Sequence, residues 1–170
     1  PALEQLRGPA PAKRIIDAYP NLDKPTQLLL VQMFGRKGDP AYLPILKEAA
    51  ASEDNAFRMA ALKALSSSSS VDALPVLVTI AKNGSEEERA LALEAASNVA
   101  GSLGTSGDAD AAGSAYWELF DLSEDPAVRR TALQGLVRYP VAGAYGTIMK
   151  SLDNESLGDV ARAALPEIGR

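Results

Sequence analysis

The 170-residue chain contains no cysteine and no histidine, and only 5% of its residues are aromatic. Without cysteine it can form no disulfide, thiolate metal site or thiol nucleophile. Without histidine it lacks the most common general base and the most common transition-metal ligand. We therefore expect a protein that is not an enzyme and that holds no metal or other cofactor.

Clustered positive charge and long apolar runs are also missing. The chain has 17 basic and 22 acidic residues, a formal charge of −5, and no long Lys/Arg run. Nucleic acids and anionic membranes attract clustered positive charge, so neither is an expected partner. No apolar run reaches the roughly 18 residues that a membrane-spanning helix needs. The chain starts at Pro1 without a signal-like segment, which indicates a piece of a longer protein and leaves its compartment open.

Aliphatic residues are abundant instead. Hydrophobic residues make up 46% of the chain, and because aromatics are few, most of them are Ala, Leu, Val and Ile. This composition is typical of closely packed helices. A chain of this length fits one domain that buries roughly 70% of the surface exposed by its unfolded form.

A repeated segment is the main signal in the sequence. Asp54–Leu65 aligns without a gap with Asp125–Leu136, and a shift of 31 positions relates Asp54 to Ser85 and to Asp23. A fifth copy covers 157–165. Asp or Ser at the start of a copy is a good N-cap, and apolar residues at helical spacing follow it. The repeats therefore predict one amphipathic helix per copy.

Another helix is expected upstream of each copy. Leu-Pro occurs as Leu43-Pro44 in the segment 40–46 and again, 31 positions later, as Leu74-Pro75 in the segment 71–77. Proline is tolerated in the first turn of a helix, where its missing N–H has no partner to lose. Each Leu-Pro pair therefore predicts the start of a helix, and each unit is a pair of helices.

This pattern resembles the HEAT repeat: a first helix bearing proline, a short turn led by Asp, and a second helix that opens with an apolar-Arg pair followed by small residues. The resemblance covers roughly residue 11 to the C-terminus. It implies an all-α fold, a right-handed α-solenoid of about five HEAT-like helix pairs of the armadillo type. We expect a single domain, 1–170, with units at 11–35, 39–66, 70–100, 110–138 and 141–169. The matching residues are Leu74-Pro75-Val76-Leu77, Asp54, Phe57-Arg58, Ala60-Ala61, Asp125, Val128-Arg129 and Ala132-Leu133.

Two polar segments are expected to be surface turns within the solenoid. Gly101–Asp110 is rich in glycine and predicts a long loop, and Ser66–Ser70 predicts a connector between helix pairs.

The resemblance also implies a binding surface, because the second helices of HEAT repeats line the concave face. Repeat offsets place Gln32, Lys63, Glu94 and Gln134 in one row and Leu28, Met59, Ala90 and Arg130 in the next. We expect a non-catalytic, monomeric scaffold that binds a protein or peptide there; the alternative is a merely solvated helix face. The candidate contacts are Leu28, Gln32, Met59, Lys63, Glu94, Arg130 and Gln134.

Three arginines at repeat spacing, Arg58, Arg89 and Arg129, have two interpretations. They could clamp a phosphate or carboxylate. The resemblance favours a structural ladder in which they pair with Asp54 and Asp125 of the repeat turns.

Two further groups have a functional and a structural interpretation. Tyr116, Trp117 and Phe120 could form a binding hot spot, but we favour a core in which Trp117 and Phe120 share the buried face. Asp108 and Asp110 resemble part of a calcium loop that lacks its final glutamate, so we expect no metal there.

Two alternatives to a scaffold stay open. The domain could be a spacer attached to a catalytic domain elsewhere in a longer protein, as HEAT-like arrays of bacteria often are. A HEAT-like enzyme, such as a DNA glycosylase or a pigment lyase, fits less well. A glycosylase of that type would need a basic concave face with aromatic residues, whereas this chain is acidic and poor in aromatics.

Overall fold

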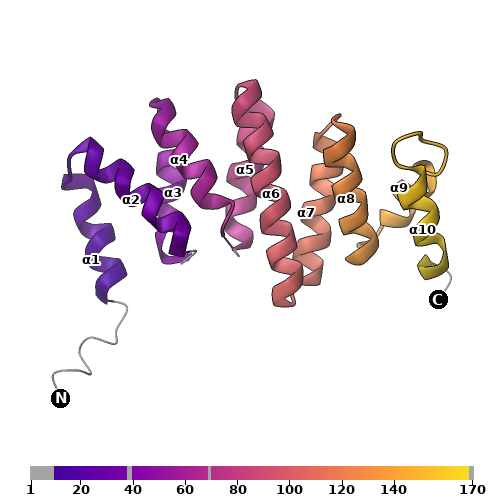
Figure 1. The fold of residues 1–170 in the computed structure, drawn as a ribbon. Coiled ribbons are helices and arrows are strands. Elements are labelled where there is room, and N and C mark those ends of the chain that lie inside the picture. The colour runs from indigo at the N-terminus through magenta and orange to yellow at the C-terminus, as the bar shows by residue number, and fades with distance from the viewer. Residues whose placement is uncertain (1–9, 38–39, 69, 169–170) are drawn as a thin grey trace, which may run out of the picture. The chain divides into compact units, whose positions relative to one another are not determined.

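The computed structural model describes residues 10–37, 40–68 and 70–168, and every regular element in these ranges is an α-helix or a short 3-10 helix (Figure 1). This confirms the all-α fold class. The chain divides into two compact units, 1–68 and 69–170. Whether they act as the single domain expected from the sequence stays a prediction.

The first unit is built around its last helix. It contains α1 (Ala10–Ala18), α2 (Lys24–Lys37), α3 (Leu43–Ala50) and α4 (Asn55–Leu65). Helix α4 packs against both α2 and α3. The Phe34 ring, from α2, stacks on Tyr42 at a centroid distance of 4.0 Å. The best-buried large side chains are Val31, Leu62 and Leu65.

In its described residues, the second unit contains six α-helices: α5 (Leu74–Asn83), α6 (Glu86–Ser106), α7 (Ala109–Leu122), α8 (Pro126–Arg138), α9 (Ala144–Lys150) and α10 (Gly158–Ile168). Consecutive helices pack together from α5 to α10, and α8 also contacts α10. The best-buried large side chains are Leu77, Val99, Leu133, Leu136 and Ile148.

Local chemistry starts the helices where the sequence predicts. The Asp54 carboxylate accepts from the Ala56 amide at 2.9 Å, and the Asp125 carboxylate accepts from the Ala127 amide at 2.7 Å. The Leu-Pro pairs occupy the first positions of α3 and α5. Each Asp side chain gives an acceptor to a backbone N–H that would otherwise have none, and each proline has no N–H to leave unpaired. These residues therefore determine where the helices of a repeat begin.

The predicted long loop at Gly101–Asp110 is wrong. Helix α6 continues to Ser106, and the turn consists of Gly107, with a φ of 100°, and Asp108. Gly104 lies inside the helix and leaves room for an aromatic ring: a Cβ there would lie 2.2 Å from Cζ of Tyr139. The serine connector is confirmed at its ends, where Ser66 ends α4 and Ser70 caps the next 3-10 helix. Ser69 lies outside the described residues.

Candidate functional site

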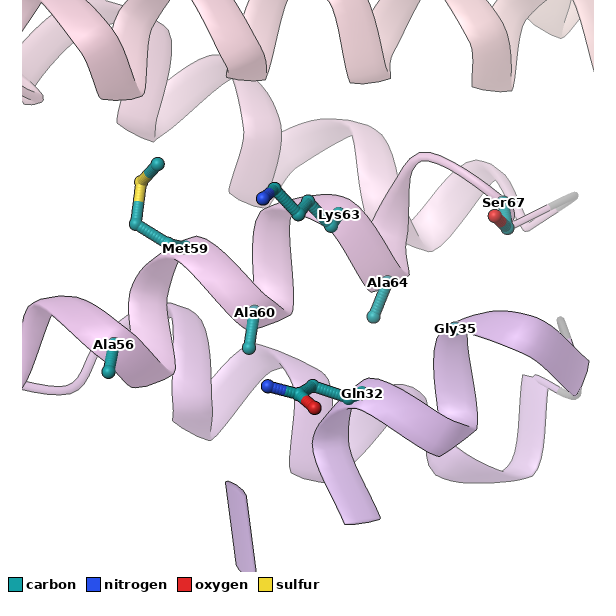
Figure 2. Close-up of a pocket in the computed structure, with 8 residues that line it drawn as sticks. All are labelled: Gln32, Gly35, Ala56, Met59, Ala60, Lys63, Ala64 and Ser67. Atoms are coloured by element: carbon teal, nitrogen blue, oxygen red, sulfur yellow. The ribbon is translucent and has the colours of Figure 1, made fainter. Parts of the chain in front are cut away.

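A groove lies between α2 and α4 in the first unit (Figure 2). Its volume is about 470 Å³. We call it the α2–α4 groove, and its lining residues are Gln32, Gly35, Ala56, Met59, Ala60, Lys63, Ala64 and Ser67.

Small residues let the two helices of this groove approach closely. A Cβ on the buried Gly35 would lie 2.5 Å from Cα of Ala64. Ala60 and Ala64 are buried between the helices, while Lys63 is exposed and Met59 is half-buried. In Figure 2, Gln32 extends from α2 toward Ala60. The groove therefore has small apolar residues on its inside and polar or flexible side chains at its edge.

A second groove lies between α8 and α10 in the second unit. Its volume is about 340 Å³. Gln134 and Arg130 occupy the repeat positions that Lys63 and Met59 occupy in α4, 71 residues earlier. We call it the α8–α10 groove, and its lining residues are Arg130, Gln134, Val137, Asp159, Val160, Ala163 and Ala164.

Arg130 joins the two helices of this second groove. Its Nη1 donates to Oδ1 of Asp159 at 2.8 Å and to the carbonyl of Ser156 at 2.8 Å, and its Nη2 contacts Oδ2 of Asp159. The bond lowers the pKa of the Asp159 carboxyl and raises the pKa of Arg130. The charge of Arg130 is therefore already paired within the chain.

The acid stability of the second unit should depend on this pair. The pKa of Asp159 is lowered from 3.8, mainly by its bond to Arg130. A carboxyl with a lower pKa in the folded state stabilises the fold above its unfolded pKa, and this contribution is lost as the pH falls through the folded pKa. Asp159→Asn should therefore lower the unfolding temperature at neutral pH and approach the unsubstituted chain in acid below pH 3.8. Thermal unfolding measured across this range checks the prediction, and a gap independent of pH would contradict it.

The structure brings together some of the predicted contact residues and not others. Gln32, Met59 and Lys63 line the α2–α4 groove, and Arg130 and Gln134 line the α8–α10 groove. The half-buried Leu28 and the exposed Glu94 line neither groove. A continuous row through both units stays a prediction.

The arginines of the expected ladder have different surroundings. Arg58 donates from Nη1 to the carbonyls of Ser52 at 2.9 Å and Glu53 at 2.8 Å. Arg129 lies over the Phe120 ring, 4.5 Å from its centroid, and Arg89 is exposed. The pairing of these arginines with Asp54 and Asp125 of neighbouring repeats stays a prediction.

The aromatic cluster contributes to the core through a different pair than expected. Tyr116 and Phe120 are buried, whereas Trp117 is half-buried and donates from Nε1 to Asp121 at 3.0 Å.

Asp108 caps α7 by accepting from the Ala111 amide. Among the described residues, no group of three acidic, His or Cys side chains could hold a metal ion. No helix in the described ranges is long and apolar enough to cross a membrane.

Comparison with known families adds to this geometry. A family model described as HEAT repeats matches residues 12–97, about half of the chain. No curated protein matches the sequence. The matched range includes the repeat starts at Asp54 and Ser85 and the whole α2–α4 groove. On this match the chain belongs to the HEAT-repeat family.

Proposed function

We propose that this protein is a non-catalytic interaction module whose α2–α4 groove binds a short segment of a partner protein. The observation that carries the proposal is that one groove combines Gln32, Met59 and Lys63, all of which the repeat spacing selects as contacts. HEAT repeats commonly serve as protein-interaction scaffolds, and the family is generally non-catalytic. Both properties support this function.

The lining of the groove suggests the chemistry of the segment. Ala56 and Ala60 offer apolar surface, and the flexible thioether of Met59 adapts to side chains of different shape. Gln32 can both donate to and accept from a peptide backbone. Lys63 is exposed and has no ion pair within the described ranges, so it favours an acidic side chain. We therefore propose a segment with an apolar residue next to Asp or Glu.

The α8–α10 groove is less suited to the same segment. Gln134 replaces the lysine, and Arg130, the one cation among the described residues that line this groove, is bonded to Asp159. We assign recognition of the acidic side chain to the α2–α4 groove. Arg130→Glu would break the bond to Asp159 as well as change the surface, so it is a poor test of binding.

The test is selection of peptides from a random library on the full chain, followed by measurement of the Kd of the best peptide. Lys63→Glu should weaken binding about tenfold, because reversing an exposed charge replaces a weak attraction with a repulsion, a change of roughly 1–2 kcal/mol. Lys13→Glu is the matched control, since Lys13 is exposed on α1 and lines no part of the groove. Its Kd should equal that of the unsubstituted chain.

Two results would overturn the proposal. Equal binding by the Lys63→Glu and Lys13→Glu variants would place the peptide elsewhere. Failure to select any peptide would favour the alternative function, a spacer attached to a catalytic domain.

A further inference from the structure

A third pocket lies where α7, α8 and α9 meet in the second unit, and it has a different chemistry. Its volume is about 230 Å³, and it shares no residue with the α8–α10 groove. We call it the Arg129 pocket, and its lining residues are Phe120, Asp121, Arg129, Thr147, Lys150, Ser151, Asn154 and Leu157.

The guanidinium of Arg129 has unused hydrogen-bonding capacity. Arg58, at the same repeat position 71 residues earlier, donates to the carbonyls of its own turn. In the described part of the chain, Arg129 makes no side-chain hydrogen bond, and its buried Nε has no acceptor. It is held instead over the Phe120 ring at 4.5 Å. Buried donors nearly always have a partner, so an unpaired one beside a pocket indicates a missing acceptor.

Two other polar side chains of the pocket, Lys150 and Asn154, also have donors without an acceptor among the described residues. Lys150 is exposed and has no ion pair with any described residue. The Asn154 Oδ1 accepts from the amides of Ser156 at 2.9 Å and Leu157 at 3.1 Å, and no described residue accepts from its NH₂ group. A ligand that supplies oxygen acceptors would complement these groups.

The charges of the pocket indicate how much negative charge it accepts. Arg129 and Lys150 each carry a positive charge, and Asp121, which accepts from Nε1 of Trp117, carries a negative one. One positive charge is left uncompensated. A carboxylate carries one negative charge and matches the planar fork of a guanidinium, whereas a phosphate dianion would add a second charge close to Asp121.

We propose that the Arg129 pocket binds a carboxylate, such as an acidic side chain of a protein partner. The guanidinium of Arg129, whose Nε has no acceptor, supplies the donors, Lys150 supplies the second charge, and the Phe120 ring holds the guanidinium in place. This site is independent of the α2–α4 groove, which belongs to the other unit, so either proposal can fail without the other.

The test is a titration of the nitrogen-15-labelled full chain with sodium acetate, followed through the Nε–H signals of its arginines by NMR. The Arg129 signal is assigned by its loss in Arg129→Lys. We expect it to shift saturably with acetate, while the Arg58 signal, whose guanidinium already has carbonyl partners, stays in place. Sodium chloride at the same ionic strength is the control for screening, and sodium phosphate is the competing ligand.

Two variants that leave Arg129 in place add a charge test. Lys150→Gln should weaken acetate binding about fivefold, and Asp121→Asn, which keeps an acceptor for Trp117, should strengthen it by a similar factor. The proposal is overturned if acetate and chloride shift the Arg129 signal equally, if phosphate alone saturates it, or if both variants bind like the unsubstituted chain.

Discussion

Replacing Gly135 with alanine is expected to destabilise the second unit by about 2–3 kcal/mol, as overpacking of a core does. An added Cβ would lie 2.3 Å from Cγ of Tyr116. The ring cannot easily move, because Tyr116 is buried and stacks with Tyr139 at 6.3 Å. The prediction opposes local propensity, since alanine normally stabilises a helix interior relative to glycine by roughly 0.5–1 kcal/mol. Urea-induced unfolding followed by circular dichroism measures the change.

Gly146→Ala is the matched control for Gly135→Ala. Gly146 lies in α9, and no atom of another element lies within 4 Å of where its Cβ would be. Only helix propensity should act there, so a gain of about 0.5–1 kcal/mol is expected. If both substitutions change the free energy of unfolding by the same amount, the close packing of α7 on α8 does not require glycine at position 135.

Removing either of two repeat-equivalent leucines should have a still larger effect. Leu62 and Leu133, 71 positions apart, are 1% and 0% exposed. Leu62→Ala in the first unit and Leu133→Ala in the second should each cost about 2–5 kcal/mol, since a buried leucine loses both its transfer free energy and its packing. Chemical denaturation of each variant measures the loss in the free energy of unfolding.

Exposed leucines provide the comparison for this second prediction. Leu29 on α2 is 55% exposed and Leu165 on α10 is 41% exposed. Their replacement by alanine should change stability by less than about 1 kcal/mol. The repeat register assigned to α4 and α8 is contradicted if Leu62→Ala costs no more than Leu29→Ala, or Leu133→Ala no more than Leu165→Ala.

Features that depend on neighbouring residues could be predicted from the sequence. Asp54 and Asp125 cap helices because their side chains reach amides only two positions away. The prolines of the Leu-Pro pairs likewise act within one turn. The length of α6 could not be predicted, because the need for glycine at position 104 comes from the ring of Tyr139, 35 positions later in the chain. Glycine at such a site is required by the packing of a distant side chain, whereas the sequence alone suggests a turn there.

The candidate site was predictable to a similar extent. Repeat spacing places Gln32 and Lys63 on corresponding faces of successive second helices, and both line the α2–α4 groove. It does not predict that Arg130 bonds to Asp159, because that contact depends on how α10 packs on α8. Nor does it show that Arg129, unlike Arg58, lacks hydrogen-bond partners. An Asp in the first turn of the last helix is the only sequence signal for the Arg130 contact, and it suits the helix dipole equally well.

The most direct test of peptide binding in the α2–α4 groove uses the methionine methyl groups as reporters. The chain has three methionines: Met59 lines the groove, Met33 is exposed elsewhere on α2, and Met149 is exposed on α9 in the second unit. With carbon-13-labelled methyl groups, addition of the selected peptide should shift the Met59 signal saturably and leave Met149 unchanged. A shift of the Met149 signal without one of Met59, or no shift of either while the peptide binds, would contradict peptide binding in the α2–α4 groove.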